Sequence, residues 1–109
     1  VLEQAVNYAE QAGHLSGYAL IALLRAEART HAGQFVLAAR EAQSLRALVA
    51  TMPYPFVAAG ALQVQAECAR RTGDEARAAA LFAAAAAVFD ATGCIHRGAL
   101  SRRAAVNAD

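Results

Sequence analysis

The chain contains no lysine. All ten of its basic residues are arginine, and nine acidic residues leave a formal net charge of only +1 at pH 7. A charge this close to balance argues against a domain built mainly to bind polyanions such as nucleic acids. Cysteine is also scarce, since Cys68 and Cys94 are the only two in 109 residues. They are too few for a disulfide framework, and we expect two free thiols in a reducing cytoplasm rather than a bridge or a redox switch.

The sequence also lacks an apolar run long enough to cross a membrane. The uncharged run from Ala78 to Phe89 has twelve residues, whereas a membrane-spanning helix needs about 20. Five of the twelve are consecutive alanines, which have the highest helix propensity and a small side chain. The run therefore predicts a buried helix that neighbours approach closely on more than one side. Because neither a secretory leader nor a starting Met is visible, we expect a cytoplasmic segment of a longer protein.

Motifs for nucleotide binding and catalysis are missing too. Neither G-x-x-x-x-G-K-[ST] nor G-x-G-x-x-G occurs, so we expect no nucleotide to be held by its phosphates. His14, His31 and His96 lie near different turns, and their spacing gives no Ser-His-Asp or Cys-His arrangement. Cys94 and His96 form a C-x-H pair, which offers too few ligands for zinc. We therefore expect no enzymatic activity, no cofactor and no metal ion.

Regularly spaced turn residues are the most informative feature that is present. Gly13, Gly33, Pro53, Gly73 and Gly93 follow one another at intervals of twenty residues. Glycine is favoured just past the C-terminus of a helix, and proline cannot continue a helix. Between these turns the apolar residues recur at spacings of three and four, without the alternation of strands. The sequence therefore predicts an all-α chain with helices at 2–12, 16–32, 35–51, 55–72, 75–92 and 95–107.

The predicted helices repeat in pairs with a period of forty residues. The second helices of two pairs match after this shift: Ala38, Ala42, Leu45 and Val49 correspond to Ala78, Phe82, Ala85 and Phe89. The first helices correspond in the same way, for example through Ala26 and Ala66. Two-helix units at a fixed period bury their faces by stacking on one another. The pattern indicates a right-handed α-solenoid of about three two-helix units.

One residue of the last predicted helix does not fit this repeat. Arg102 falls where the shift places Ala22 and Leu62 on the core-facing side, and burying an unpaired arginine is costly. We expect the array to end at this helix, with the arginine facing solvent or a following domain, because the ends of solenoids need a polar outer face. Together with Arg97 and Arg103, it is interpreted as part of a solvated helix face rather than as a nucleic-acid contact.

The segments AEARTHAGQFVLAAREAQSL and ALQVQAECARRTGDEARAAALFAAAAAVFDATG resemble tetratricopeptide-type repeats. Ala66 stands seven residues before Gly73, and Ala78 stands five after it. The period of forty is longer than the family's usual period of about 34, and an aromatic residue expected early in the first helix is missing. The closing segment AAAVFDATGCIHRGALSRRAA is similar to the repeat region of large LuxR-type bacterial transcriptional regulators. The resemblance implies an interaction or sensor segment, with DNA bound only by a domain outside it.

Polar residues on the first helix of each pair form the candidate binding site. Spacings of three and four keep them on one helix face. The two stripes are Glu27, Thr30 and His31, and, about forty residues on, Gln63, Glu67, Arg70 and Arg71. In tetratricopeptide-type arrays this face lines the concave groove, so the resemblance implies a protein or peptide partner, or adjacent domains of the same chain.

Other interpretations of this face remain open. The groove could sense a small molecule. The segment could also be a structural spacer, or could form a homodimer, within a signalling ATPase, kinase or cyclase regulator. The polar residues could simply be solvated positions joined by ion pairs within a helix, such as Glu67 with Arg71.

Overall fold

The computed structural model describes residues 15–50, 54–91 and 95–108, and within these ranges every residue is in an α-helix or a short connection. The helices are α2 (Leu15–His31), α3 (Phe35–Val49), α4 (Pro55–Arg71), α5 (Glu75–Ala91) and α6 (Ile95–Ala108). The all-α prediction is therefore confirmed for the described part of the chain. The predicted boundaries differ from these by at most two residues. The predicted helix 2–12 and the turn residues Gly13, Pro53 and Gly93 lie outside the described residues.

Two of the predicted turn residues end helices as expected. Gly33 and Gly73 have φ angles of +82° and +92°, in the left-handed region that glycine adopts without steric cost. After Gly73, the backbone N–H of Asp74 donates to the Ala69 carbonyl at 2.8 Å, which closes the end of α4. The Asp74 side chain then accepts from the N–H of Arg77 at 3.2 Å and caps the start of α5. These local signals explain why the boundaries could be predicted from sequence.

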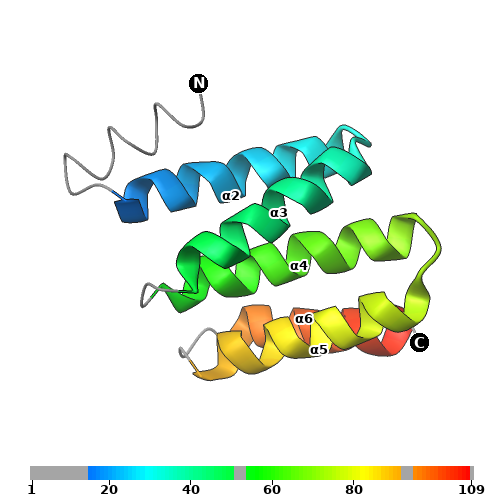
Figure 1. Ribbon diagram of the computed structural model, residues 1–109. Coiled ribbons are helices and arrows are strands. Elements are labelled where there is room, and N and C mark those ends of the chain that lie inside the picture. The colour runs from blue at the N-terminus through cyan, green and yellow to red at the C-terminus, as the bar shows by residue number, and fades with distance from the viewer. Residues whose placement is uncertain (1–14, 51–53, 92–94, 109) are drawn as a thin grey trace.

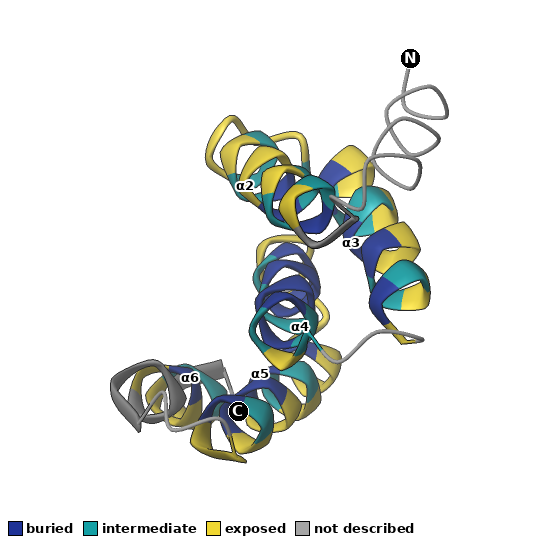
Figure 2. Ribbon diagram, turned by 90° about the vertical axis from the view of Figure 1, so that its left-hand side faces the viewer, coloured by how far each residue is buried: buried dark blue, intermediate teal, exposed yellow. Residues whose placement is uncertain are grey.

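Consecutive helices run antiparallel and pack side by side (Figure 1). Viewed along the helices, the chain forms an arc with α2, α4 and α6 on its concave side and α3 and α5 on its outer side (Figure 2). Contacts between neighbouring helices dominate, and α2 also packs directly against α4. The first helices of the predicted pairs therefore share one concave face.

Small and apolar side chains form the core between the helices. All the second-helix positions that match after a shift of forty residues are buried: Ala38, Ala42, Leu45, Val49, Ala78, Phe82, Ala85 and Phe89. One cluster joins α2, α3 and α4 around Leu23 and Val57, while Ala66 and Ala78 lie in a second cluster between α4 and α5. At the far end of α5, Phe89 meets Phe56 edge to face, with ring centroids 6.1 Å apart. Alanine at the helix contacts allows the backbones to approach closely.

The alanine-rich run lies in α5, which packs against both α4 and α6. Packing on more than one side is thus confirmed. The burial is nevertheless incomplete, because Ala83, Ala84 and Ala87 face solvent while Ala85 and Ala86 are buried. Among the described residues, no helix combines the length and the apolar character required to span a membrane.

Arg102 lies on the solvent side of α6, as expected. Its guanidinium is half-exposed and forms an ion pair with the carboxylate of Asp90 on α5. The neighbouring Ser101 is fully buried instead. The core-facing assignment of Ala22 and Leu62 needs correction, because both are only half-buried at the edges of the core clusters. The repeat position that Ala22, Leu62 and Arg102 share is therefore at the border of the core, where the long side chain of an arginine can reach solvent.

Candidate functional site

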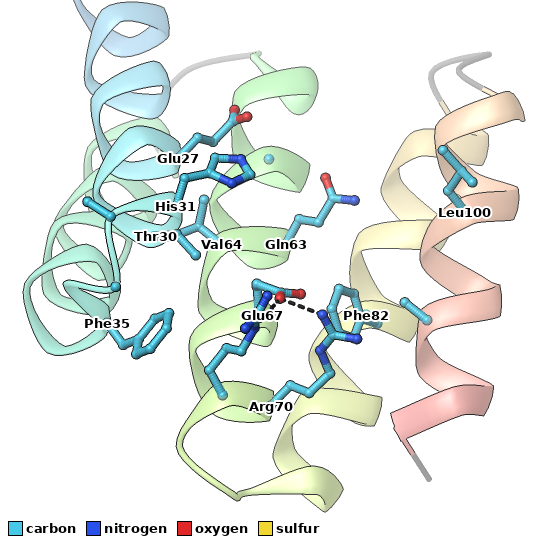
Figure 3. A pocket seen from close by; sticks show the side chains of 15 residues that line it. Glu27, Thr30, His31, Phe35, Gln63, Val64, Glu67, Arg70, Phe82 and Leu100 are labelled. Carbon is cyan, nitrogen blue, oxygen red and sulfur yellow. Dashed lines mark hydrogen bonds and ion pairs between the residues drawn. The ribbon is translucent and has the colours of Figure 1, made fainter.

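A groove of about 820 Å³ lies on the concave face between α2, α4 and α6 (Figure 3). All of the candidate residues line it: Glu27, Thr30, His31, Gln63, Glu67, Arg70 and Arg71. The structure thus brings together two polar stripes that are about forty residues apart in sequence. Apolar side chains also line it, among them Phe35, Val64, Phe82, Leu100 and Ala104. These apolar residues are not among the predicted site residues.

A close approach of α2 to α4 places the two polar stripes next to each other. Leu23 on α2 lies against Gly60 on α4, where a Cβ atom would come within 2.6 Å of the Leu23 Cδ2 atom. A larger residue at this position would require the Leu23 side chain to shift. The stripe of Glu27 and His31 therefore stands beside the stripe of Gln63 and Glu67 on one surface (Figure 3).

A three-residue charge cluster on α4 occupies one end of the groove. Glu67 Oε1 accepts hydrogen bonds from Arg70 Nη2 at 2.5 Å and from Arg71 Nε at 3.0 Å. The ion pair between Glu67 and Arg71, named above for the alternative in which these are solvated positions, is present, and Arg70 shares the same carboxylate. Two guanidinium groups against one carboxylate leave a net charge of about +1 on the cluster. Both arginines are exposed, so their remaining N–H groups are accessible to an anion.

The carboxylate of Glu67 stays ionised to a lower pH than that of an ordinary glutamate. Partial burial by itself raises the pKa of Glu67, but the hydrogen bonds and positive charges of Arg70 and Arg71 outweigh burial. The pKa of Glu67 is therefore held below its ordinary value. The cluster keeps its arrangement of charges at neutral pH.

The opposite wall of the groove carries Glu27 and His31 on α2. Neither forms an ion pair with another described residue. Glu27 is half-buried and His31 is exposed, and both lie at the surface of the groove (Figure 3). The groove is therefore asymmetric in charge, with a carboxylate on the α2 wall and the arginine pair near the end of α4.

The other two candidate residues have polar groups that are already engaged within the protein. The Thr30 hydroxyl donates to the Ala26 carbonyl at 2.9 Å and lies 3.8 Å from the Cys68 sulfur. Thr30 therefore offers chiefly its methyl group to the groove. Gln63 Nε2 donates to the Ser101 hydroxyl at 3.3 Å and links α4 to α6. These contacts shape the groove wall and leave fewer polar groups for a ligand.

A smaller cleft of about 360 Å³ lies between α2 and α3, lined in part by Tyr18, Arg40 and Leu48. Glu41 also lines it and pairs with Arg25 at 3.0 Å. Burial raises the pKa of the Tyr18 hydroxyl, although the nearby Arg25 charge opposes this. The cleft is separate from the groove, and Arg40 within it provides a comparison position for charge changes.

Cys68 is a free thiol buried between α2 and α4. Burial raises its pKa, although the hydrogen bond with Thr30 opposes this, so the thiol stays protonated near neutral pH. Cys94 and the side chain of His96 lie outside what the structure describes. Within the described residues, no group of three or more His, Cys, Asp or Glu side chains is arranged to hold a metal ion.

Comparison of the chain with protein-family models, curated proteins and solved structures finds no match. The described part of the chain is all-α and has a concave groove. Apolar side chains form the floor of this groove, and charged side chains form its rim. Such a lining favours a ligand with both apolar and charged groups, because the floor provides burial and the rim provides orientation.

Proposed function

We propose that this chain is an interaction module that binds a protein or peptide partner in the groove between α2, α4 and α6. In this proposal the chain is an α-solenoid of about three two-helix units with a period of forty residues. The observation that carries the proposal is the gathering of all seven candidate residues on one groove surface. Residues far apart in sequence contribute one mixed apolar and charged lining, which suits an amphipathic partner.

Recognition in this proposal is steric and electrostatic. The partner's apolar groups cover Phe35, Val64 and Phe82, while Arg70 and Arg71 attract a carboxylate. Glu27 on the opposite wall disfavours the reversed orientation of an acidic segment. Charge complementarity of this kind controls specificity and the association rate more than it controls total affinity.

The proposed setting is a LuxR-type transcriptional regulator in the bacterial cytoplasm. Support comes from the resemblance of the closing segment, residues 85–105, to the repeat region of that family. Binding in the groove would change the packing of the helical units and so influence adjacent domains of the same chain. DNA would be contacted only by a domain outside this segment, and the module itself would have no catalytic role.

A second candidate is the sensing of a small molecule in the same groove. The volume of about 820 Å³ supports it, because pockets for small ligands range from about 300 to 1,000 Å³. Mass spectrometry of the purified protein under native conditions separates the two candidates. A bound small molecule that disappears when the groove is altered would favour sensing over peptide binding.

The test of the proposed function removes the positive charge at the groove. Arg70→Gln and Arg71→Gln are preferred to glutamate, because glutamates there would face the carboxylate of Glu67 without a counter-charge. We expect the double variant to keep its helical content and to lose at least about tenfold in partner capture and in regulator output.

Arg40→Gln is the matched control, since Arg40 is an exposed arginine on α3 outside the groove. It should leave both measurements unchanged. Equal effects of the two changes would refute the groove as the binding site. The segment would then be better explained as a structural spacer or as a dimerisation segment.

A further inference from the structure

The two helices beside α4 on the concave face pack against it to different extents, α2 closely and α6 only weakly. On one side, α2 packs directly against α4, with Leu23 lying against Gly60. In contrast, α6 packs mainly against α5, and its hydrogen bond to α4 runs from Gln63 to Ser101 at 3.3 Å. The two neighbours of α4 on the concave face are therefore held in different ways.

Two residues on the α6 side are larger than their counterparts forty residues earlier. A shift of forty residues takes Ala42 to Phe82 and Gly60 to Leu100. Ala42 lies in the core behind α2 and α4, and Phe82 takes the corresponding place behind α4 and α6. Gly60 leaves room for α2, whereas Leu100 adds a side chain on the corresponding face of α6. The α6 side therefore carries more side-chain volume at both positions than the α2 side.

A furrow lies between α4 and α6, lined by Gln63, Phe82, Leu100 and Ala104. Its wall includes Leu100, which is 47% exposed although it is a large apolar residue. Phe82, only 3% exposed, contributes the base. Arg70 lies beside Phe82 at the end of the furrow (Figure 3).

We propose that this furrow holds one large apolar side chain, of the size of leucine or phenylalanine, from an acidic peptide segment. The inference rests on the proposed function and defines the chemistry of the partner. The apolar wall and base provide the anchor, since binding energy concentrates in large side chains that fill a desolvated pocket. The net positive charge of the Glu67, Arg70 and Arg71 cluster selects a carboxylate next to that side chain.

An extended peptide fits the groove better than a compact ligand does. The polar lining continues from the furrow across α4 to Glu27 and His31 on α2. A peptide anchored in the furrow can reach this second wall with its following residues. Leu100 and Phe82 are thereby the residues that determine specificity for the anchor, and the arginines determine specificity for the flanking charge.

The test uses the full chain and four fluorescein-labelled octapeptides as probes. They share one polar sequence and differ at two adjacent positions, which carry phenylalanine or serine and then glutamate or lysine. We expect the phenylalanine–glutamate peptide to bind at least about tenfold more tightly than the peptides that lack either group. Fluorescence anisotropy gives the four dissociation constants.

Variants then locate the anchor. Leu100→Ala and Phe82→Leu, which keeps an apolar but smaller side chain, should each weaken the preference for phenylalanine by about fivefold or more and leave the preference for glutamate intact. Val106→Ala is the matched control, because Val106 is an exposed apolar residue of the same helix that does not line the groove. It should change neither preference.

The other outcomes of these measurements overturn the furrow as an anchor, the proposed function, or both. Binding that depends on Arg70 and Arg71 but ignores phenylalanine and Leu100 would leave the proposed function standing and refute the furrow as an anchor. Absence of binding by all four peptides would refute both. A dimer in sedimentation that Leu100→Ala dissociates would show that a second copy fills the furrow, and would equally overturn the peptide assignment.

Discussion

Leu23 of α2 lies in the space that the missing side chain of Gly60 leaves on α4. A Cβ atom at Gly60 would stand 2.6 Å from Leu23 Cδ2 and 3.0 Å from Leu23 Cδ1. Leu23 is 1% exposed, so surrounding atoms limit its movement. This contact lies between the two helices that carry the polar stripes.

Gly60→Ala should therefore lower the free energy of unfolding by about 1–3 kcal/mol, because overpacking strains a close helix contact. The loss should outweigh the gain of up to about 1 kcal/mol from replacing glycine within a helix. Urea denaturation measures the change. Gly17→Ala is the control, since a Cβ at Gly17 in α2 meets nothing within 4 Å, and it should be neutral or stabilising. An equal gain from both variants would contradict the close contact.

Ala66→Leu and Ala78→Leu should each destabilise the fold by about 1–3 kcal/mol. Both alanines are fully buried in the cluster between α4 and α5, where a larger side chain has no free volume. Ala83→Leu provides the comparison, because Ala83 is an exposed position of α5. Thermal denaturation followed by circular dichroism should show lower melting temperatures for the first two variants alone. Unchanged melting of both would mean that the helices do not approach closely there.

The ion pairs of Glu67 should make stability depend on acid pH. Its pKa is lower in the folded protein than the ordinary value of about 4.3 in an unfolded chain. The stabilisation is therefore fully present above that ordinary value and is lost as pH falls through the folded pKa. Exposed pairs contribute under about 1 kcal/mol, so the effect is small.

Glu67→Gln isolates this contribution. The variant should be less stable than the parent at pH 7, and the difference should shrink as pH falls below about 4. Paired urea titrations at several pH values measure it. A difference that stays constant with pH would show that the carboxylate charge of Glu67 does not stabilise the fold.

Duplex DNA should bind the chain only weakly, with a dissociation constant on the order of 10⁻⁴ M or weaker near physiological salt. Five of the arginines already pair with carboxylates: Arg25 and Arg29 with Glu41, Arg70 and Arg71 with Glu67, and Arg102 with Asp90. Pairing and a net charge of +1 leave few counterions to release. Anisotropy of a labelled duplex tests this expectation, and tight sequence-selective binding would disprove it.

Local signals in the sequence determined the helices and the composition of the polar stripes. Glycine at Gly33 and Gly73 ends a helix because of backbone sterics that act within a few residues. The spacing of Glu27, Thr30 and His31 places them on one face of any helix that contains them. These features could therefore be predicted before the packing of the chain was known.

Tertiary packing alone decided which polar groups of those stripes are engaged within the protein. The Thr30 hydroxyl is engaged with Ala26, and Arg70 and Arg71 share the carboxylate of Glu67. The apolar floor also depends on packing, because Phe82 of α5 lines a groove whose walls are α2, α4 and α6. Periodicity assigns a residue to a face of its own helix. It does not give the distance to the next helix, which depends on the volumes of all the side chains between them.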